Sequence, residues 1–256
     1  MLDNGYLYAN DENRLFINTC LGCIGECSYC YLPKMGYSNK EKLNKIMSTE
    51  EIITLLKESD FNLSTNTLIT LGCFSECWDE KNKPETIKLI KYFLSKGNQV
   101  QLSTKRQICE EEISDILPLI KYYGQFIIFV SSSTISMHDT IEKNTEKIEN
   151  RFKTFDLIKK NIPVILYIKP VLKNITYKDI DLYKMYIEKY KICNVVVGSI
   201  FTNELSNETV HFSNKNELFY NPIDDEKLIV NELNKVCHVF LRSTDVTNFF
   251  KSSKWE

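Results

Sequence analysis

Residues 19–33 read TCLGCIGECSYCYLP and contain three cysteines, Cys23, Cys27 and Cys30, in a CxxxCxxC spacing. Three thiolates can bind three irons of a four-iron, four-sulfur cluster and leave the fourth iron open, whereas a closed structural site takes all its ligands from the protein. The spacing therefore predicts an iron–sulfur site that is open to chemistry, with Cys23, Cys27 and Cys30 as its ligands.

Zinc binding and disulfide bonding are the alternative uses of these cysteines. Zinc sites usually combine one cysteine pair with a second pair of Cys or His. The three histidines, His138, His211 and His238, are too scattered to form a local pair. Nine cysteines are an odd number, and no secretory signal is recognisable, which disfavours a disulfide framework. Zinc remains the main alternative to the cluster.

Size and composition predict one α/β domain. The chain has 256 residues, of which 43% are hydrophobic. It contains no run approaching the ~18 apolar residues of a membrane span, and its polar start, residues 1–10, has no apolar signal segment. We expect a cytoplasmic protein that keeps its cysteines reduced and does not enter a membrane. The formal net charge of −2 gives no overall attraction to nucleic acid, although a local basic patch would.

Apolar runs of strand length alternate with helical patterns along most of the chain. The predicted strands are 14–18, 67–71, 99–103, 126–131, 163–168 and 194–200. The predicted helices begin with a capping box at 48–51 and continue at 84–97, 110–123 (bent or broken near Pro118), 146–160 and 177–190. Because a helix follows each strand, the pattern indicates right-handed βα units and a parallel sheet.

Six such units predict a partial (β/α)6 TIM-like barrel over residues 1–200. Residues 201–256 are expected to form a small α+β C-terminal extension, with a helix at 224–236 and a strand at 238–242, which closes the barrel and shapes the substrate pocket. Active sites of parallel α/β sheets lie beyond the carboxyl ends of the strands. The cysteine loop follows the first strand, so the strand pattern and the cysteine spacing indicate the same edge of the sheet.

The cysteine spacing, with an aromatic residue just before the third cysteine, resembles the signature of the radical S-adenosylmethionine (SAM) superfamily. The resemblance implies that the open iron binds the amino and carboxylate groups of SAM, and that reductive cleavage of SAM yields a 5′-deoxyadenosyl radical. It also implies an electron-donating partner such as flavodoxin or ferredoxin.

Strings at several strand ends resemble spore photoproduct lyase and its relatives over about residues 14–200. They are GCIGECSYCYL at 22–32, GCFSE at 72–76, STK at 103–105, FVS at 129–131, EKNT at 142–145, Arg151, and KPV at 169–171. In that family a radical removes a hydrogen atom from a cross-linked thymine pair in DNA, the cross-link fragments, and a cysteine supplies a hydrogen atom. The resemblance implies a lyase of DNA repair, with Cys73 at the position of the hydrogen donor.

Two tyrosines and a second thiol complicate the assignment of the hydrogen donor. Tyr29 and Tyr31 flank Cys30 in the pattern of family tyrosines that relay the hydrogen atom, and their alternative role is packing around the cluster. Cys77 follows Cys73 by four residues and is the alternative thiol for hydrogen donation. A buried small residue at a strand end is the structural alternative for Cys73.

Three residues match family positions that bind the methionine end of SAM. Ser75 and Ser131 match serines that hydrogen-bond it, and Lys105 matches a lysine that pairs with its carboxylate. The alternative for Lys105 is a solvated loop charge, and the serine run 131–133 leaves the register of Ser131 open. Arg151 is more typical of an exposed helix charge than of a SAM or substrate ligand.

The substrate is the part of the function that these motifs leave open. Residues 201–256 do not match the lesion-binding part of spore photoproduct lyase, and Lys153, Lys159 and Lys160 read as solvated helix surface, not as a DNA-binding patch. One hypothesis is a lyase-like enzyme acting on a nucleic-acid lesion. A second is a radical SAM enzyme of the same fold acting on a small molecule, nucleotide or peptide. A third is a non-catalytic iron–sulfur or zinc protein used for sensing or binding.

Overall fold

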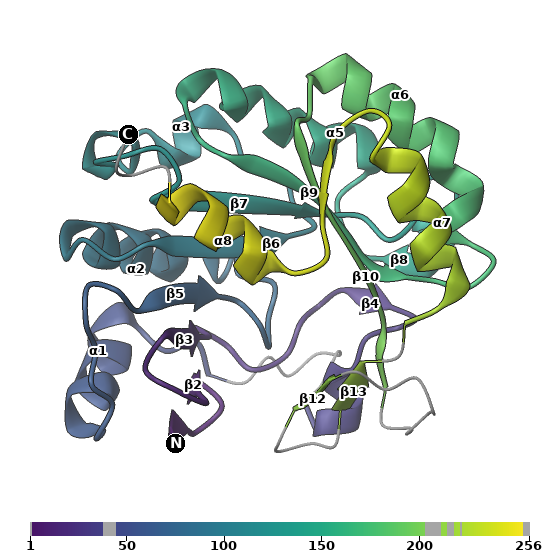
Figure 1. Cartoon of the computed structure of the whole chain (residues 1–256). Helices are drawn as coiled ribbons and strands as arrows, with labels where there is room; N and C mark the ends of the chain where they lie inside the picture. The colour runs from purple at the N-terminus through teal and green to yellow at the C-terminus, as the bar shows by residue number, and fades with distance from the viewer. Residues whose placement is uncertain (1, 38–44, 203–210, 214–217, 221, 253–256) are drawn as a thin grey trace.

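The main sheet of the computed structural model has nine strands (Figure 1). In order across the sheet they are β1 (Leu2–Asp3), β2 (Leu7–Ala9), β3 (Arg14–Ile17), β5 (Leu68–Leu71), β6 (Val100–Thr104), β7 (Phe126–Ser131), β9 (Val164–Val171), β10 (Asn194–Ser199) and β14 (His238–Phe240). The structure describes residues 2–37, 45–202, 211–213, 218–220 and 222–252. From β3 to β14 every neighbouring pair is parallel, whereas β1 and β2 add antiparallel at one edge.

This sheet confirms the predicted α/β fold of the partial TIM-like barrel type. Each of the six predicted core strands is present, with ends within three residues of the expected ones. The strand expected at 238–242 is also present as β14, and it pairs in parallel with β10. It therefore extends the core by a seventh parallel strand. The division of the chain near residue 200 stays a prediction.

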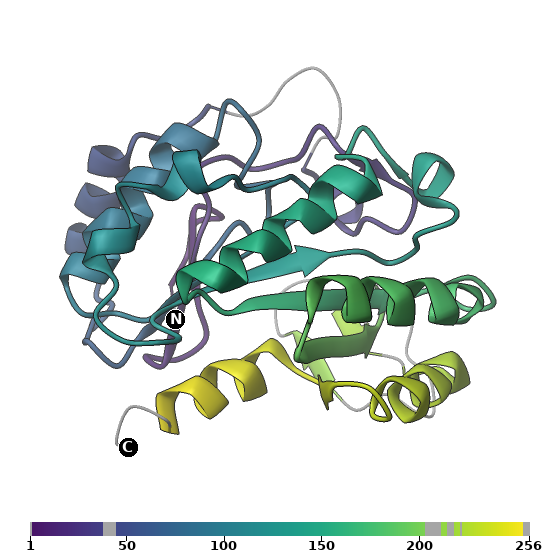
Figure 2. The same cartoon turned by 90° about the horizontal axis from the view of Figure 1, so that it is seen from above.

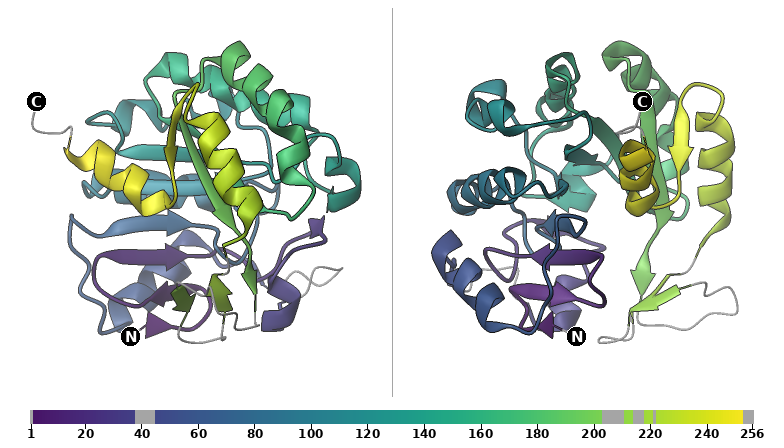
Figure 3. Two further views of the ribbon diagram at one scale, coloured as in Figure 1. Left: turned by 45° about the vertical axis from the view of Figure 1, so that its right-hand side comes forward. Right: turned by 60° about the vertical axis from the view of Figure 1, so that its left-hand side comes forward.

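Helices cover the convex face of the curved sheet, as Figures 2 and 3 show. They are α1 (Thr49–Glu58), α2 (Lys83–Ser95), α3 (Glu110–Ile113), α5 (Ile148–Lys153), α6 (Ile180–Tyr190) and α7 (Asp224–Leu233). Leu15 and Ile17 of β3 pack into the core beneath these helices. Because side chains alternate between the two faces along a strand, Arg14 and Phe16 face the concave side. No helix among the described residues has both the length and the apolar character of a membrane span.

Local sequence signals set several helix ends. Ser48 and Glu51 form the predicted capping box: the N–H of Glu51 donates to Ser48 Oγ at 3.2 Å, and the N–H of Ser48 donates to a Glu51 carboxylate oxygen at 2.8 Å. The helix predicted at 110–123 is broken as expected. A 3-10 turn at Leu117–Leu119 follows α3 and contains Pro118, which has no N–H to continue a helix.

Helix α8 (Ser243–Ser252) lies on the concave face, at the amino ends of the strands (Figure 3). Its side chains belong to a second core, made of Ile127, Phe129, Ile165, Val196, Phe240, Val246 and Phe250. Gly124 permits this packing, because a Cβ at that position would lie 2.4 Å from the Cβ of Phe250. Helix α8 therefore fills the amino-terminal part of the barrel interior.

Two small sheets border the barrel mouth. Strands β4 (Glu26–Cys27) and β8 (Glu142–Lys143) pair antiparallel. Strands β11 (Phe201–Thr202), β12 (His211–Ser213) and β13 (Leu218–Tyr220) form the other sheet, which is also antiparallel. The Tyr220 hydroxyl donates to Glu226 of α7 at 2.6 Å and accepts from the N–H of Ser199 at 3.1 Å. The rest of the polar loop expected after residue 200 lies outside the described residues.

Candidate active site

The cysteine loop begins after β3 and holds its three thiols at the carboxyl ends of the barrel strands. Cys27 stands opposite Glu142 in the β4–β8 pair. The N–H of Gly25 donates to Cys23 Sγ at 3.2 Å, and the N–H of Cys30 donates to the carbonyl oxygen of Cys27 at 3.0 Å. The backbone thus folds tightly around the thiols, and all three remain partly exposed.

One cavity of about 430 Å³ connects the cysteine loop with the strand ends. Its lining includes every residue predicted to take part in the site: Cys23, Cys27, Cys30, Tyr29, Tyr31, Cys73, Ser75, Lys105 and Ser131. These residues come from the loop after β3, the turn after β5, and the ends of β6 and β7. Parallel strands bring their carboxyl ends to one edge, which is why segments so far apart in sequence meet here.

The three loop cysteines provide the donor type that an iron–sulfur cluster uses, and they line one cavity. Burial raises the pKa of Cys23 to about 12, and the charge of Glu76 adds to this effect. Burial also raises the pKa of Cys27 and Cys30, while the positive charge of Lys105 acts in the opposite direction. Cluster ligands are thiolates, so binding of the cluster would release the thiol protons.

A cluster and a single metal ion differ in how closely their protein ligands must converge. In the part of the chain that the structure describes, no three Cys, His, Asp or Glu side chains converge as ligands of a single metal ion. A cluster distributes three thiolates over three irons and needs no such convergence.

Two polar side-chain groups in the cavity lining have no hydrogen-bond or ion-pair partner among the described residues. Ser75 Oγ is buried and has no hydrogen-bond partner among the described residues. Lys105 Nζ lies 5.5 Å from the centroid of the Tyr29 ring, over its face, and ion-pairs with no described carboxylate. Burial opposes the charge of Lys105, but Cys27 and Glu142 outweigh burial and raise its pKa. A cation and a hydroxyl are therefore available to a ligand beside the cysteine loop.

The structure resolves the register of the serine run that ends β7. Ser131 lines the cavity, whereas the two serines after it do not. Ser132 Oγ donates to the carbonyl oxygen of Thr134 at 3.2 Å, and the N–H of Ser133 donates to Glu142 at 3.1 Å. Ser131 is thus the serine of this run that faces the cavity.

Cys73 and not Cys77 faces the cavity. Burial raises the pKa of Cys73 to about 12, and Asn18 Nδ2 donates a weak hydrogen bond to its Sγ at 3.6 Å. Cys77 is 2% exposed, is absent from the lining, and contacts the Ser103 carbonyl oxygen through Sγ at 3.8 Å. Gly72 has φ +76°, and a Cβ there would lie 2.7 Å from the Cβ of Cys77, so this tight turn requires glycine.

The two tyrosines beside Cys30 have different partners. The Tyr31 hydroxyl donates to the carbonyl oxygen of Cys73 at 2.6 Å. The Tyr29 hydroxyl donates a short hydrogen bond to the Glu142 carboxylate. Tyr31 therefore joins the cysteine loop to the turn that carries Cys73, and Tyr29 joins the loop to β8.

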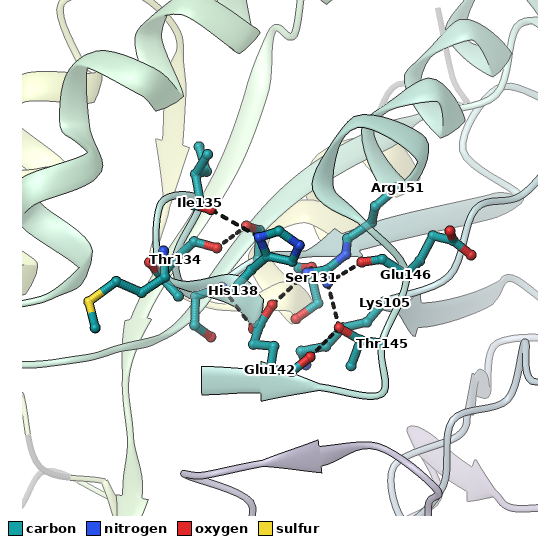
Figure 4. Close-up of polar contacts among 12 residues, drawn as sticks. Lys105, Ser131, Thr134, Ile135, His138, Glu142, Thr145, Glu146 and Arg151 are labelled. Carbon is teal, nitrogen blue, oxygen red and sulfur yellow. Dashed lines mark hydrogen bonds and ion pairs between the residues drawn. The ribbon is translucent and has the colours of Figure 1, made fainter. Parts of the chain in front are cut away.

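Arg151 is the centre of a buried network beside the site (Figure 4). Its side chain is fully buried, so the expectation of an exposed helix charge is wrong. One terminal nitrogen donates to the Ser131 carbonyl oxygen at 2.8 Å and to Glu142 at 2.6 Å. The other donates to Thr145 Oγ1 and to the Glu146 carbonyl oxygen, each at 2.8 Å. These four acceptors explain why Arg151 can be buried. The residues next to Arg151 on the helix give no indication of them.

Glu142 links that network to the cysteine loop. Its carboxylate accepts from Arg151, Tyr29 and the N–H of Ser133. Burial alone would raise the pKa of Glu142, but the charges of Arg151 and Lys105 hold it below the ordinary value. The ionised carboxylate therefore fixes β8, and through β8 the cysteine loop, against β7.

Asn18 and Glu76 also shape the site, although the motifs assign neither residue a role. Asn18 Oδ1 accepts from the N–H of Phe74 at 2.7 Å. Glu76 accepts from Thr104 Oγ1 at 2.6 Å and from the N–H of Lys105 at 2.9 Å. The two-residue period of the first strand indicates that Asn18 faces inward. No local signal indicates the partners of Glu76, because they lie on the next strand.

The family comparison defines the class of protein to which this fold and site belong. The radical SAM superfamily matches residues 17–186, which is more than half of the chain. The chain therefore belongs to the radical SAM superfamily, whose members use a four-iron, four-sulfur cluster and SAM and need an external reductant. A comparison with curated protein sequences finds no match.

Solved structures with this fold include spore photoproduct lyase, as the motifs predict. A lyase complexed with dinucleoside spore photoproduct is 12% identical, with a TM-score of 0.62 over 88% of this chain and 75% of that chain. A lyase variant with bound AdoMet and dinucleoside spore photoproduct is 11% identical, with a TM-score of 0.63 over 89% and 76%. Streptococcus suis SuiB bound to S-adenosylmethionine is 10% identical, with a TM-score of 0.59 over 90% of this chain and 50% of that chain. At these identities the similarity shows a shared fold.

Proposed function

We propose that this chain is a radical SAM enzyme of the spore photoproduct lyase type, acting on a cross-linked thymine lesion in DNA, with Cys73 as the hydrogen donor. One observation carries the proposal. The three loop cysteines, the polar groups of Ser75, Lys105 and Ser131, and the Cys73 thiol all line a single cavity.

The chain's own residues would hold the cofactors in this cavity. Cys23, Cys27 and Cys30 ligate the cluster, and Lys105 pairs with the carboxylate of SAM. Such a charge-assisted hydrogen bond contributes about 1.5–3 kcal/mol. Ser75 brings an unpaired hydroxyl to the same ligand. Once bound, the cluster and SAM together supply a carbon-centred radical that abstracts hydrogen from the substrate.

Cys73 suits hydrogen donation because its thiol stays protonated. With a pKa near 12, the group is S–H and not thiolate at neutral pH. The substrate radical takes the hydrogen atom from Sγ: the S–H bond breaks, a C–H bond forms, and the unpaired electron remains on sulfur. Tyr31, hydrogen-bonded to the Cys73 carbonyl, is the proposed source of the next hydrogen atom, and Tyr29 the second member of this relay.

The proposed partners follow from the same chemistry. We take the reductant to be a flavodoxin or ferredoxin and the lesion to be carried by DNA. None of the nine cysteines, all of which lie among the described residues, forms a disulfide. Reduced thiols suit a reducing compartment, and a cytoplasmic location is part of the proposal.

A second candidate is a radical SAM enzyme of the same fold acting on a small molecule, nucleotide or peptide. The observation that favours it is the similarity to SuiB, whose TM-score of 0.59 is close to the 0.62 of the lyase. The fold alone therefore does not select the substrate.

Anaerobic reconstitution with iron, sulfide, SAM and a strong reductant tests the catalytic proposal. We expect 5′-deoxyadenosine to form. If the cluster is loaded but no 5′-deoxyadenosine forms, the catalytic proposal is wrong and the non-catalytic sensing hypothesis is favoured. A synthetic thymine cross-link should then be returned to thymines, and competent SAM cleavage without repair would select the second candidate.

The role of Cys73 needs its own variant and control. Cys73→Ala should retain SAM cleavage while altering the products of the quenching step. Cys193→Ala is the matched control, because Cys193 is exposed and does not line the cavity. An unchanged product distribution in Cys73→Ala would remove this thiol from the mechanism.

A further inference from the structure

Arg14 of β3 is a cavity-lining cation that forms no ion pair with a carboxylate among the described residues. Arg106, the other arginine in the lining, lies 2.7 Å from the Asp79 carboxylate. Arg14 instead donates a single hydrogen bond, from Nε to Thr70 Oγ1 at 2.9 Å, and forms no ion pair with any described residue. Its two terminal amino groups are left without a partner in the described chain. A partly buried guanidinium with four unused N–H donors calls for an acceptor from outside the protein.

The groups around Arg14 fix its direction and add a further donor. The guanidinium carbon lies 4.3 Å from the centroid of the Phe16 ring, which holds the planar group by a cation–π contact. Thr70 Oγ1 accepts from Arg14 and also from Gln101 Nε2 at 2.9 Å. Because both acceptor positions of this hydroxyl are used, its own proton remains to be donated. Tyr167 also lines the cavity.

We propose that Arg14 and Thr70 form an anion-binding end of the substrate site, which takes a phosphate or carboxylate group of the substrate. The fork of a guanidinium matches both groups with two parallel hydrogen bonds, and the threonine hydroxyl supplies a third. The inference rests on the proposed function in one respect, that the substrate enters this cavity. It adds that the substrate is anchored through an oxyanion remote from the reacting carbon.

The position of this anion site suits the chemistry at the other end of the cavity. Thr70 and Cys73 are three residues apart, which is at most about 10 Å of chain. A substrate held at Arg14 therefore extends toward the Cys73 thiol. Asp3 and Glu76 line the same cavity and bring negative charge to its wall. Lys105, the lining cation beside Glu76, is assigned above to the carboxylate of SAM, so Arg14 is left for an anionic group of the substrate.

The first test measures whether an anion protects Arg14 of the wild-type protein against chemical modification. Phenylglyoxal should modify Arg14 in the free protein, and peptide mapping by mass spectrometry should show at least a fivefold lower yield in the presence of millimolar phosphate or acetate. Exposed Arg242 is the internal control and should not be protected. Protection by phosphate alone supports a phosphoryl group, and protection by acetate alone supports a carboxylate. Equal protection of both arginines, or protection by chloride at the same ionic strength, would overturn the inference.

Calorimetric titration with inorganic phosphate is the second test. Arg14→Met keeps much of the side-chain volume and should weaken binding at least tenfold, which corresponds to about 1.4 kcal/mol. Arg14→Lys should be intermediate because it keeps the charge but loses the fork, and Arg242→Met should bind as the wild type does. A folded Arg14→Met protein with wild-type affinity would refute the site. Neither test uses SAM cleavage or lesion turnover, so a failure here is distinguishable from a failure of the proposed function.

Discussion

Replacing Arg151 with methionine should lower the free energy of unfolding by about 3–5 kcal/mol, the usual cost of removing one partner from a buried ion pair. Arg151 and Glu142 are both at most 1% exposed, and their closest approach is 2.6 Å. Methionine would leave the Glu142 charge unpaired and would also release the carbonyl oxygens of Ser131 and Glu146. Tyr29 would still donate to Glu142, which should keep the loss within this range.

The pH dependence gives the same prediction a second readout. In the wild type, Arg151 and Lys105 outweigh burial and hold the pKa of Glu142 below its ordinary value of 4.5. Stability from a carboxyl group with a lowered pKa is present above the unfolded pKa and is lost as the pH falls through the folded one. In Arg151→Met, burial should dominate and raise the pKa of Glu142. Protonation of Glu142 would then remove the unpaired charge in the variant. The loss of unfolding free energy relative to the wild type should therefore be smaller at pH 4.5 than at pH 7.

Urea unfolding curves at several pH values are the assay, with Arg242→Met as the matched control. Because Arg242 is exposed, its replacement should change the free energy of unfolding by no more than about 0.5 kcal/mol. A loss below about 1 kcal/mol for Arg151→Met, or a deficit that stays constant with pH, would refute the electrostatic account of this network. The double variant Arg151→Met, Glu142→Leu should lose less than the sum of the two single changes, because the unpaired charge is then absent.

Three further outcomes follow from the geometry. Cys27→Ala should abolish iron loading and SAM cleavage, whereas Cys109→Ala should affect neither; a cleavage-competent Cys27→Ala protein would show that the ligand set is wrong. Lys105→Met should keep the cluster but weaken SAM binding at least tenfold, measured by calorimetry under anaerobic conditions. Unchanged affinity would mean that Lys105 does not bind SAM and is a solvated loop charge. Phe250→Ala should cost about 3–5 kcal/mol of unfolding free energy, because its ring is buried between α8 and the concave face of the sheet; a loss below about 1 kcal/mol would mean that α8 does not pack there in solution.

Predictions that depend on interactions between residues close in sequence are correct more often than those that depend on distant segments. The capping box at Ser48 and the break near Pro118 depend on hydrogen bonds within a few residues, and both are present. The exposure expected for Arg151 is wrong because its partners lie on other segments, up to twenty residues away. The register of Ser131 also had to come from the structure, since three identical residues carry no alternation of their own.

The cysteine spacing, the strand periodicity and the alternation of strands with helices are properties of short segments. The order of amino acids alone was therefore sufficient for the superfamily, the fold and the residues expected at the strand ends. Only the folded chain decides that Cys73 and not Cys77 faces the cavity, and that α8 occupies the barrel interior. It also decides that Arg14 lines the same cavity with no ion-pair partner in the part of the chain that the structure describes. These features depend on contacts between residues far apart in sequence, and such contacts exist only once the parallel strands have brought those residues together.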